Sequence, residues 1–210
     1  MRYGMLIDLD KCIGCGACAA ACKQEHATGA SIYYNRIVRS EQGEYPVSKL
    51  VSLPYACMHC MTPKCAEVCS TGATYRDTET GIVRIDYETC DGCGACEAAC
   101  PYEVRQFNPP EGDTSDQYWG ADQEPTPFEQ AKTQNRVPGV AQKCQLCHER
   151  LEAGGIPACV ETCIVGARVF GDLDDPASEV SLAIEKRAAE VLLPDEKTGP
   201  SIYYAGEIPV

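Results

Sequence analysis

The feature that most constrains this 210-residue chain is the spacing of its sixteen cysteines, which form four groups of four with none left over. The groups are Cys12, Cys15, Cys18 and Cys22; Cys57, Cys60, Cys65 and Cys69; Cys90, Cys93, Cys96 and Cys100; and Cys144, Cys147, Cys159 and Cys163. Disulfide-rich domains of this cysteine density are usually shorter and secreted. The stretch from Met1 to Lys11 is too short for a secretory signal peptide, so we expect no export signal and favour metal binding.

Groups one and three follow the spacing C-x₂-C-x₂-C-x₃-C, which ligates [4Fe–4S] clusters in bacterial ferredoxins. Three cysteines at two-residue intervals wrap a loop around one cluster, and glycines between them allow left-handed backbone conformations. We expect the fourth cysteine on a helix that begins at the third. Because four helical residues rise only about 6 Å, Cys22 and Cys100 then face a neighbouring site and ligate a second cluster.

A structural zinc site is the alternative, since two C-x₂-C pairs can hold one zinc ion. Zinc does not require a third cysteine at the same interval, and here that spacing occurs twice in full. Group four, with eleven residues between Cys147 and Cys159, fits a zinc site if it is taken by itself. Cys22 needs a second cluster, however, and group four is the only unassigned supplier of ligands.

The chain also repeats itself around these groups. The stretch LIDLDKCIGCGACAAAC aligns with RIDYETCDGCGACEAAC, and CAEVCSTGA aligns with CVETCIVGA. The expected fold class is α+β, with two ferredoxin-like 2[4Fe–4S] modules, one inserted in the other, long loops and a C-terminal tail. The expected boundaries are residues 1–49 with 141–170 for a split module (groups one and four), 50–108 for a contiguous module (groups two and three), 109–140 for a proline-rich loop, and 171–210 for the tail.

Exchange of the fourth cysteine within each module predicts the ligands of four [4Fe–4S] clusters, so that all sixteen cysteines bind iron. The sets are Cys12, Cys15, Cys18 and Cys163 (cluster 1); Cys57, Cys60, Cys65 and Cys100 (cluster 2); Cys90, Cys93, Cys96 and Cys69 (cluster 3); and Cys144, Cys147, Cys159 and Cys22 (cluster 4). Four oxidised clusters with their thiolates would take the formal net charge from −13 to about −21. Hydrogen-bond donors and cations are therefore expected beside them.

Between the cysteine groups the predicted secondary structure is modest. Short strands are expected within Gly81–Tyr87 and Ala167–Leu173, and a helix from about Ser178 to Leu192. The segment Asn108–Lys143 has five prolines and no clear periodicity, which predicts a long loop. Trp119 lies in this loop, where a partner contact and local packing are equally good interpretations.

The sequence lacks the features of an enzyme that acts on a substrate. His26, His59 and His148 have no accompanying carboxylate pattern, and we expect His59 and His148 to pack beside a cluster. No cysteine is left as a nucleophile, and neither a P-loop nor a dinucleotide fingerprint occurs. The acidic net charge of −13 argues against a nucleic-acid partner.

The four groups, their order and the tail resemble the iron–sulfur electron-transfer subunit of the dimethyl sulfoxide reductase family of molybdopterin enzymes. The resemblance covers nearly the whole chain and is carried by GMLIDLDKCIGCGAC, CQLCHERLEAGGIPACVETC, GDLDDPASEVS and TGPSIYYAG. The opening, the long loop and TGPSIYY look most like the small subunit of respiratory arsenate reductase. The chain departs from the family pattern at Lys23, and at Ser70 and Ile164, where proline is common; these changes affect local backbone and not ligand count.

The resemblance implies a non-catalytic subunit that relays electrons through four [4Fe–4S] clusters. One partner would be a large catalytic subunit with molybdopterin guanine dinucleotide, in a reductase of the arsenate, polysulfide, dimethyl sulfoxide or catechol dehydroxylase type. The other would be a quinone-linked membrane protein or a soluble electron donor, and the tail from Gly171 would wrap the catalytic subunit. The expected location is the extracytoplasmic face of the cell membrane, reached through the twin-arginine signal of the partner, with the cytoplasm as the alternative. A free-standing polyferredoxin is the competing function, which the long loop and tail disfavour.

Overall fold

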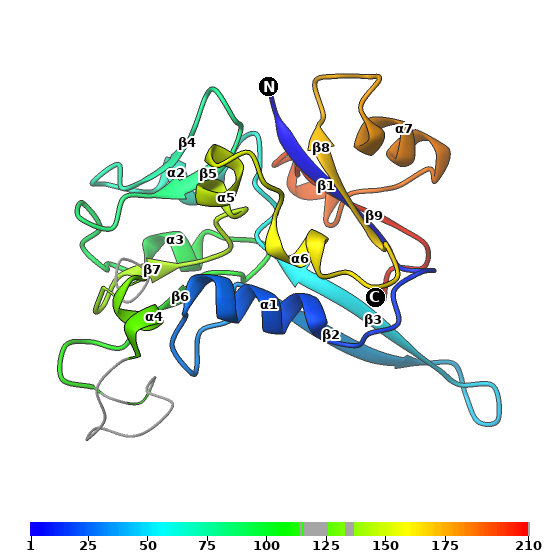
Figure 1. Ribbon diagram of the computed structural model, residues 1–210, viewed down its shortest axis with the longest axis horizontal. Coiled ribbons are helices and arrows are strands. Elements are labelled where there is room, and N and C mark those ends of the chain that lie inside the picture. Colours follow the sequence, from blue (N-terminus) through cyan, green and yellow to red (C-terminus); the bar gives the residue numbers. More distant parts are fainter. Residues whose placement is uncertain (114, 116–125, 133–136, 210) are drawn as a thin grey trace.

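A three-stranded sheet joins the two ends of the chain (Figure 1). The structure, a computed structural model, describes residues 1–113, 115, 126–132 and 137–209. Strand β1 (Tyr3–Asp8) lies in the centre of the sheet, antiparallel to β8 (Arg168–Asp172) and parallel to β9 (Ile202–Ala205). Because β1 is covered on both faces, its residues from Gly4 to Asp8 are buried in succession and do not alternate between buried and exposed.

The larger hydrophobic core lies on one face of this sheet and is continuous with the cysteines. It contains Met5 and Ile7 of β1 and Tyr204 of β9, and it extends to Met58 and Tyr102. The partly buried cysteines that pack against this core are Cys60, Cys100, Cys144 and Cys159. The thiols and the apolar side chains therefore share one interior, so that a group bound by the thiols would be part of the core.

Helix α7 (Glu179–Lys186) covers the other face of the sheet, where Leu6 packs with Val180 and Ala205. The side chain of Ser178 caps the helix by accepting a hydrogen bond from the Ser181 N–H at 3.2 Å. The helix packs closely on β8, because a Cβ atom at Gly171 would lie only 3.1 Å from Val180 Cγ1.

The prediction of a helix reaching Leu192 was wrong at its C-terminal end. Ala188 has a φ of 45°, and its N–H bonds to the carbonyl of Glu185 while the Ala189 N–H bonds back to Ile184. This pair of hydrogen bonds is a Schellman motif, which ends a helix in a left-handed residue. Glycine usually marks this position, so alanine gave no sequence signal. Glu190 then pairs with Tyr204 of β9.

A long hairpin connects the first two cysteine groups and was not predicted. Strands β2 (Asn35–Gln42) and β3 (Lys49–Ala56) pair antiparallel, with Asn35 opposite Ala56. Its apolar and polar side chains do not alternate strictly, which is why the sequence gave no clear strand signal. Figure 1 shows its tip extending away from the other elements.

The remaining elements are short. The helices are α1 (Ala17–His26), α2 (Lys64–Glu67), α3 (Ala95–Ala98), α4 (Pro127–Gln130), α5 (His148–Glu152) and α6 (Ala158–Glu161), with a 3₁₀ turn at Pro194–Glu196. Two small antiparallel pairs are formed by β4 (Thr74–Arg76) with β5 (Val83–Ile85), and by β6 (Gln106–Phe107) with β7 (Ala141–Gln142). The mixture of helices and strands confirms the α+β class.

Both predicted strands are confirmed, since β5 lies within Gly81–Tyr87 and β8 within Ala167–Leu173. The predicted loop Asn108–Lys143 is more structured than expected in its described part, which contains α4 and β7. Trp119 lies outside the described residues, so both interpretations of it stay predictions. The predicted tail begins inside β8, and its described residues include α7 and β9, which pack against β1. In the described part of the chain, no helix is long and apolar enough to span a membrane.

Candidate iron–sulfur sites

The first cysteine loop follows β1 directly and leads into α1. The Cys12 N–H bonds to the carbonyl of Asp8, the last residue of β1, at 3.1 Å. Gly14 and Gly16 have φ of 64° and 81°, and a Cβ atom at Gly14 would lie 2.3 Å from the Ser52 hydroxyl oxygen. Glycine is therefore required at Gly14 by backbone conformation and by the close approach of β3.

This loop forms a cavity with a cysteine from far along the chain, here called the Cys12 cavity. Its lining includes Cys12, Cys15, Cys18 and Cys163, with Ile7 and Arg168 at its inner side. Cys163 follows α6, which packs against α1. The structure thus brings together the four cysteines that the sequence assigned to cluster 1.

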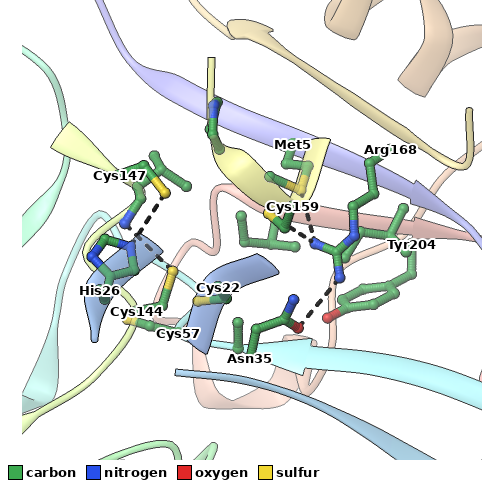
Figure 2. A pocket seen from close by; sticks show the side chains of 15 residues that line it. Met5, Cys22, His26, Asn35, Cys57, Cys144, Cys147, Cys159, Arg168 and Tyr204 are labelled. Carbon is green, nitrogen blue, oxygen red and sulfur yellow. Dashed lines mark hydrogen bonds between the residues drawn. The ribbon is translucent and has the colours of Figure 1, made fainter. Parts of the chain in front are cut away.

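A second cavity, the Cys144 cavity, lies deeper in the molecule and is shown in Figure 2. Its lining contains five cysteines, Cys22, Cys57, Cys144, Cys147 and Cys159. Cys22 lies on α1, as the sequence predicted, and Cys147 precedes α5 in a left-handed conformation with φ of 50°. The cysteines assigned to cluster 4 therefore line one cavity, together with one cysteine of the neighbouring set.

A third cavity, the Cys57 cavity, lies between the loop that follows β3 and the end of the third group. Its lining includes Cys57, Cys60, Cys65 and Cys100, the set assigned to cluster 2, and also Val83 and Arg105. The expectation that Cys100 lies on the helix beginning at the third cysteine was wrong, because α3 ends at Ala98. Cys100 nevertheless reaches the cavity from the turn that follows, where its N–H bonds to the carbonyl of Glu97.

The fourth set, here called the Cys90 site, comprises Cys69, Cys90, Cys93 and Cys96. Cys96 lies on α3, and the Cys65 and Cys90 thiols are close enough to influence its pKa. Cys69 lies two residues beyond α2, which packs against α3. The structure therefore places these two segments side by side, while Cys93 is exposed at the surface.

Hydrogen-bond donors surround the thiols, as an anionic cluster requires. Backbone N–H groups donate to sulfur from Thr74 to Cys69 at 3.3 Å, from Ala167 to Cys163 at 3.3 Å, and from Leu146 to Cys144 at 3.4 Å. Asn35 lines the Cys144 cavity, and among the described residues its buried Nδ2 has no hydrogen-bond partner. A donor left unpartnered beside a thiol-lined cavity fits a bound group that carries acceptor sulfur atoms.

Burial keeps several of these thiols protonated while no metal is bound. It raises the pKa of Cys147 and of Cys60 to about 12, and it also raises the pKa of Cys22 and Cys144. Burial would raise the pKa of Cys69 as well, but hydrogen bonds from Thr74 and Thr71 outweigh it and lower that pKa. Buried thiols of this kind become thiolates when a metal replaces their protons.

The cavities differ from a site for a single ion. Within the described ranges, no three His, Cys, Asp or Glu side chains are arranged to hold one metal ion. In each of the three cavities at least four cysteines line the wall around a shared space. This arrangement fits a cluster of several irons, in which each thiolate binds a different iron.

One histidine contacts a cysteine in a way that was not predicted from the sequence. His26 Nε2 lies 3.3 Å from Cys147 Sγ, and burial lowers the pKa of His26 to about 4, so the ring is neutral (Figure 2). His26 lies four residues after Cys22 and therefore on the same helix face. His59 is fully buried, and its Nδ1 accepts a hydrogen bond from the Val83 N–H at 3.2 Å. Burial also lowers the pKa of His148, which begins α5 beside Cys147.

Comparison with known protein families agrees with this geometry. A family model described as "4Fe-4S dicluster domain" matches residues 48–116 and again residues 111–173. A second model, described as "4Fe-4S binding domain", matches residues 3–24. The fold, the thiol-lined cavities and these matches together define an iron–sulfur protein of the 4Fe–4S dicluster class.

Similar proteins narrow the class further. The chain is 36% identical to the arsenate respiratory reductase iron–sulfur subunit of Shewanella sp. (strain ANA-3), over 97% of this chain and 96% of that protein. It is 37% identical to a subunit of the tetrathionate reductase of Salmonella typhimurium, over 98% of this chain and 72% of that protein. It is 34% identical to a subunit of the sulfite dehydrogenase of Allochromatium vinosum, over 97% of this chain and 82% of that protein.

The chain belongs to the family of iron–sulfur electron-transfer subunits of molybdopterin oxidoreductases of the dimethyl sulfoxide reductase type. As such it is an electron-transfer subunit and not itself a catalytic one. The resemblance predicted from the cysteine groups and the tail is thereby confirmed.

Proposed function

We propose that this chain relays electrons through four [4Fe–4S] clusters between a molybdopterin catalytic subunit and a second electron-transfer partner. Each cluster, when bound, supplies a one-electron acceptor and donor. The chain's own part is to hold the clusters at fixed positions, shield them from water and set their electrostatic surroundings. The observation that carries the proposal is that three cavities each bring together the four cysteines expected for one cluster, namely clusters 1, 2 and 4, with Cys57 of cluster 2 also lining the Cys144 cavity.

The exchange of cysteines between groups also supports one module inserted in the other. In the Cys12 cavity, group one is completed by Cys163, and in the Cys144 cavity group four is completed by Cys22. The pairing of β1 with β8 and the packing of α1 on α6 fit the same arrangement. The remaining set, Cys69 with Cys90, Cys93 and Cys96, follows by the same exchange within groups two and three.

Shared lining residues suggest the order of the relay. Ile7 and Arg168 line both the Cys12 and the Cys144 cavities, and Cys57 lines both the Cys144 and the Cys57 cavities. Helix α2, which carries Cys65 of the Cys57 cavity, packs against α3, which carries Cys96 of the Cys90 site. The resulting order is cluster 1, cluster 4, cluster 2 and cluster 3.

The exposure of the cysteines fits this order. All sixteen cysteines lie within the described residues, and the two exposed ones, Cys15 and Cys93, belong to clusters 1 and 3. The proposed relay therefore has a terminus near the surface at each end, while its two middle clusters lie in the interior. Such an arrangement gives each partner one point at which electrons enter or leave.

The catalytic partner is proposed to be a large subunit carrying molybdopterin guanine dinucleotide. The support is that similar proteins are subunits of an arsenate reductase, a tetrathionate reductase and a sulfite dehydrogenase. We propose a reductase of the arsenate, polysulfide, dimethyl sulfoxide or catechol dehydroxylase type. A quinone-linked membrane protein or a soluble donor is proposed at the other end, with the complex on the extracytoplasmic face of the membrane.

The first test measures iron and acid-labile sulfide on the native complex, and identifies a co-purifying large subunit by mass and molybdenum content. We expect about sixteen irons per chain, four for each of four clusters. About twelve irons, or zinc bound in place of iron, would contradict the assignment of four clusters. A fully loaded chain that purifies without a large partner would instead show a free-standing polyferredoxin.

The exchanged ligand sets have a separate test. We expect Cys163→Ala to remove the same electron paramagnetic resonance signal of the reduced protein as Cys15→Ala. We expect Cys22→Ala to remove the same signal as Cys147→Ala. Loss of one common signal from Cys163→Ala and Cys147→Ala would contradict the exchange and the split module.

A further inference from the structure

We propose that each junction between successive clusters contains one buried basic side chain that raises the reduction potentials of both neighbouring clusters. These junction cations are Arg168 between clusters 1 and 4, Lys143 between clusters 4 and 2, and Arg105 between clusters 2 and 3. The inference rests on the proposed relay and adds to it the residues that set its electrostatics. All three side chains are almost fully buried, with exposed fractions of 7%, 2% and 3%.

Arg168 contacts one cysteine from each of its two neighbouring sites. Its Nη1 donates to Cys159 Sγ at 3.6 Å, and its Nη2 donates to Cys18 Sγ at 3.5 Å. Cys159 lines the Cys144 cavity and Cys18 lines the Cys12 cavity, and Arg168 lines both. Figure 2 shows the guanidinium held by Met5 and Asn35, whose Oδ1 accepts from Nη2 at 3.3 Å. A fixed positive charge therefore lies between these two cavities.

Arg105 holds the corresponding place in the other pair of sites. It lines the Cys57 cavity, and its Nη1 donates to the Thr74 hydroxyl at 3.0 Å. The Thr74 N–H donates in turn to Cys69 Sγ at 3.3 Å. Arg105 therefore lines the Cys57 cavity and reaches, through Thr74, a cysteine of the Cys90 site. Among the described residues, Nε and Nη2 have no partner in good hydrogen-bond geometry, so these donors are left for acceptors within the sites.

Lys143 lies where the two pairs of sites meet. Its Nζ donates to the carbonyl of Cys144 at 2.9 Å and to the carbonyl of Val83. The Cys144 thiol lines the Cys144 cavity, and Val83 lines the Cys57 cavity. The ammonium is thus anchored to the walls of both cavities.

The two arginines reach equivalent places from different positions in the repeat. Asn35 pairs with Ala56, the residue before Cys57. Arg105 precedes β6, whose Gln106 pairs with Gln142, two residues before Cys144. Continuing that register places Arg105 opposite Lys143, so Arg105 corresponds to Asn35. In the split module the arginine comes from a different position of the repeat. It is Arg168, which directly follows Gly166 and Ala167, the pair that aligns with Gly72 and Ala73.

The residues that accept hydrogen bonds from the two arginines are exchanged between the same two positions of the repeat. In one module Arg168 donates to Asn35, and in the other Arg105 donates to Thr74, which lies at the position of Arg168 in the aligned repeat. A guanidinium between two thiol sets is therefore found in both modules, although the residue that supplies it differs. This recurrence is difficult to explain by packing alone, because an arginine is costly to bury without a compensating anion.

The physical effect follows from charge. Reduction adds one negative charge to a cluster, and a cation in a water-poor interior stabilises that charge strongly. A cation that lies between two clusters favours reduction of both, so their potentials shift together. Each junction cation would thereby couple two neighbouring potentials, and the three overlapping pairs would link all four clusters.

The test is an anaerobic redox titration of the native complex, followed by electron paramagnetic resonance. The variants are Arg168→Met, Lys143→Met and Arg105→Met, which keep an unbranched stem and remove the charge. We expect each to shift two cluster potentials to more negative values and leave two unchanged. The affected pairs should be clusters 1 and 4 for Arg168→Met, clusters 4 and 2 for Lys143→Met, and clusters 2 and 3 for Arg105→Met.

The charge-conserving variants Arg168→Lys, Lys143→Arg and Arg105→Lys provide the rescue, and we expect potentials closer to those of the original protein. Arg84→Met is the matched control, because Arg84 pairs with the exposed Glu152 at 3.7 Å outside the junctions. If a methionine variant loses a cluster, the potentials of the two neighbouring clusters can still be measured in the charge-conserving variant and compared with those of the control.

Shifts confined to one cluster, or equal shifts at all four, would overturn the proposal of shared cations. Unchanged potentials in a fully loaded methionine variant would overturn any electrostatic role. These results are distinct from failure of the proposed relay itself, which would be visible as fewer than four clusters in the unmodified protein.

Discussion

The two predicted modules contain similar cysteine groups but differ in the secondary structure that supports them. The split module is backed by the sheet of β8, β1 and β9 and by α7, with Leu6 and Val180 buried between them. In the contiguous module β3 pairs with β2 over eight residues, but the elements that follow are short. β4 and β5 have three residues each, β6 pairs with β7 over two residues, and α2 and α3 have four residues each. Around the contiguous module's cysteines there is little regular structure, so its stability must depend more on bound clusters.

The comparison separates two ways of supporting the same kind of site. In one, an ordinary hydrophobic layer holds the chain in place and the clusters occupy its inner face. In the other, the clusters themselves replace much of the core, as metals do in small domains. Four predictions test this difference, beginning with the largest expected effect.

Removal of iron should affect the contiguous module most. After anaerobic chelation, we expect amide hydrogens of β4 and β5 to exchange at the rate of an unfolded chain, because nothing replaces the clusters in their core. The amides of β1 and β8 should keep partial protection, since their sheet is also held by α7. Hydrogen exchange followed by mass spectrometry measures both regions in one sample. Equal loss of protection in both sheets would show that the two modules depend on iron to the same degree.

Removal of one ligand should have different effects in the interior and at the surface. Cys147 is almost fully buried and Cys93 is exposed. We expect Cys147→Ala and Cys93→Ala each to lower bound iron by about four per chain. The fall in Tm should be larger for Cys147→Ala, because it also leaves a void in the interior. Iron analysis and thermal unfolding of the same preparations provide the two values, and a larger fall for Cys93→Ala would contradict the interior position of cluster 4.

The hydrophobic support of the split module can be weakened directly. Leu6 is 1% exposed and packs against Val180 and Ala205. We expect Leu6→Ala to lower the free energy of unfolding by about 2–5 kcal/mol, the usual range for a leucine in a packed core. Leu182→Ala is the control, since Leu182 lies on α7 with its side chain largely exposed. Urea unfolding of the iron-loaded protein measures both, and similar losses would show that the face between β1 and α7 is not a true core.

The smallest expected effect is at the start of α7. Ser178→Ala removes the hydroxyl that accepts from the Ser181 N–H, which should cost about 1 kcal/mol. Ser178→Thr should recover most of this loss, because threonine keeps a hydroxyl that can accept from the Ser181 N–H and donate to the carbonyl of Asp172. Urea unfolding measures the difference, with iron content as the check that the clusters remain. An unchanged stability in Ser178→Ala would mean that packing alone fixes the start of the helix.

The features predicted correctly from cysteine spacing and other short-range sequence patterns are those that depend on local geometry. The cysteine groups, the helix carrying Cys22 and the strands within Gly81–Tyr87 and Ala167–Leu173 all follow from short-range patterns. The family resemblance followed from the same groups and from TGPSIYYAG.

What the sequence did not predict depends on distant partners. The pairing of β1 with β9 and the hairpin of β2 and β3 had no local signal, because their neighbours are separated in sequence or largely exposed. Cations near the clusters were expected, but not which residues supply them. Lysine is almost never fully buried, so nothing in the sequence alone marked Lys143, although it immediately precedes a predicted ligand.

The central position of β1 has a consequence for biosynthesis. β1 cannot form its parallel pair until Ile202 to Ala205 have been made, and Ile202 comes 197 residues after its partner Met5 (202 minus 5). At about 5–20 residues per second, β1 waits on the order of 10–40 s for that partner. For most of this time Leu6 also lacks Val180, its packing partner on α7. The loading of the Cys12 cavity, which also needs Cys163, is therefore a late event in the life of each newly made chain.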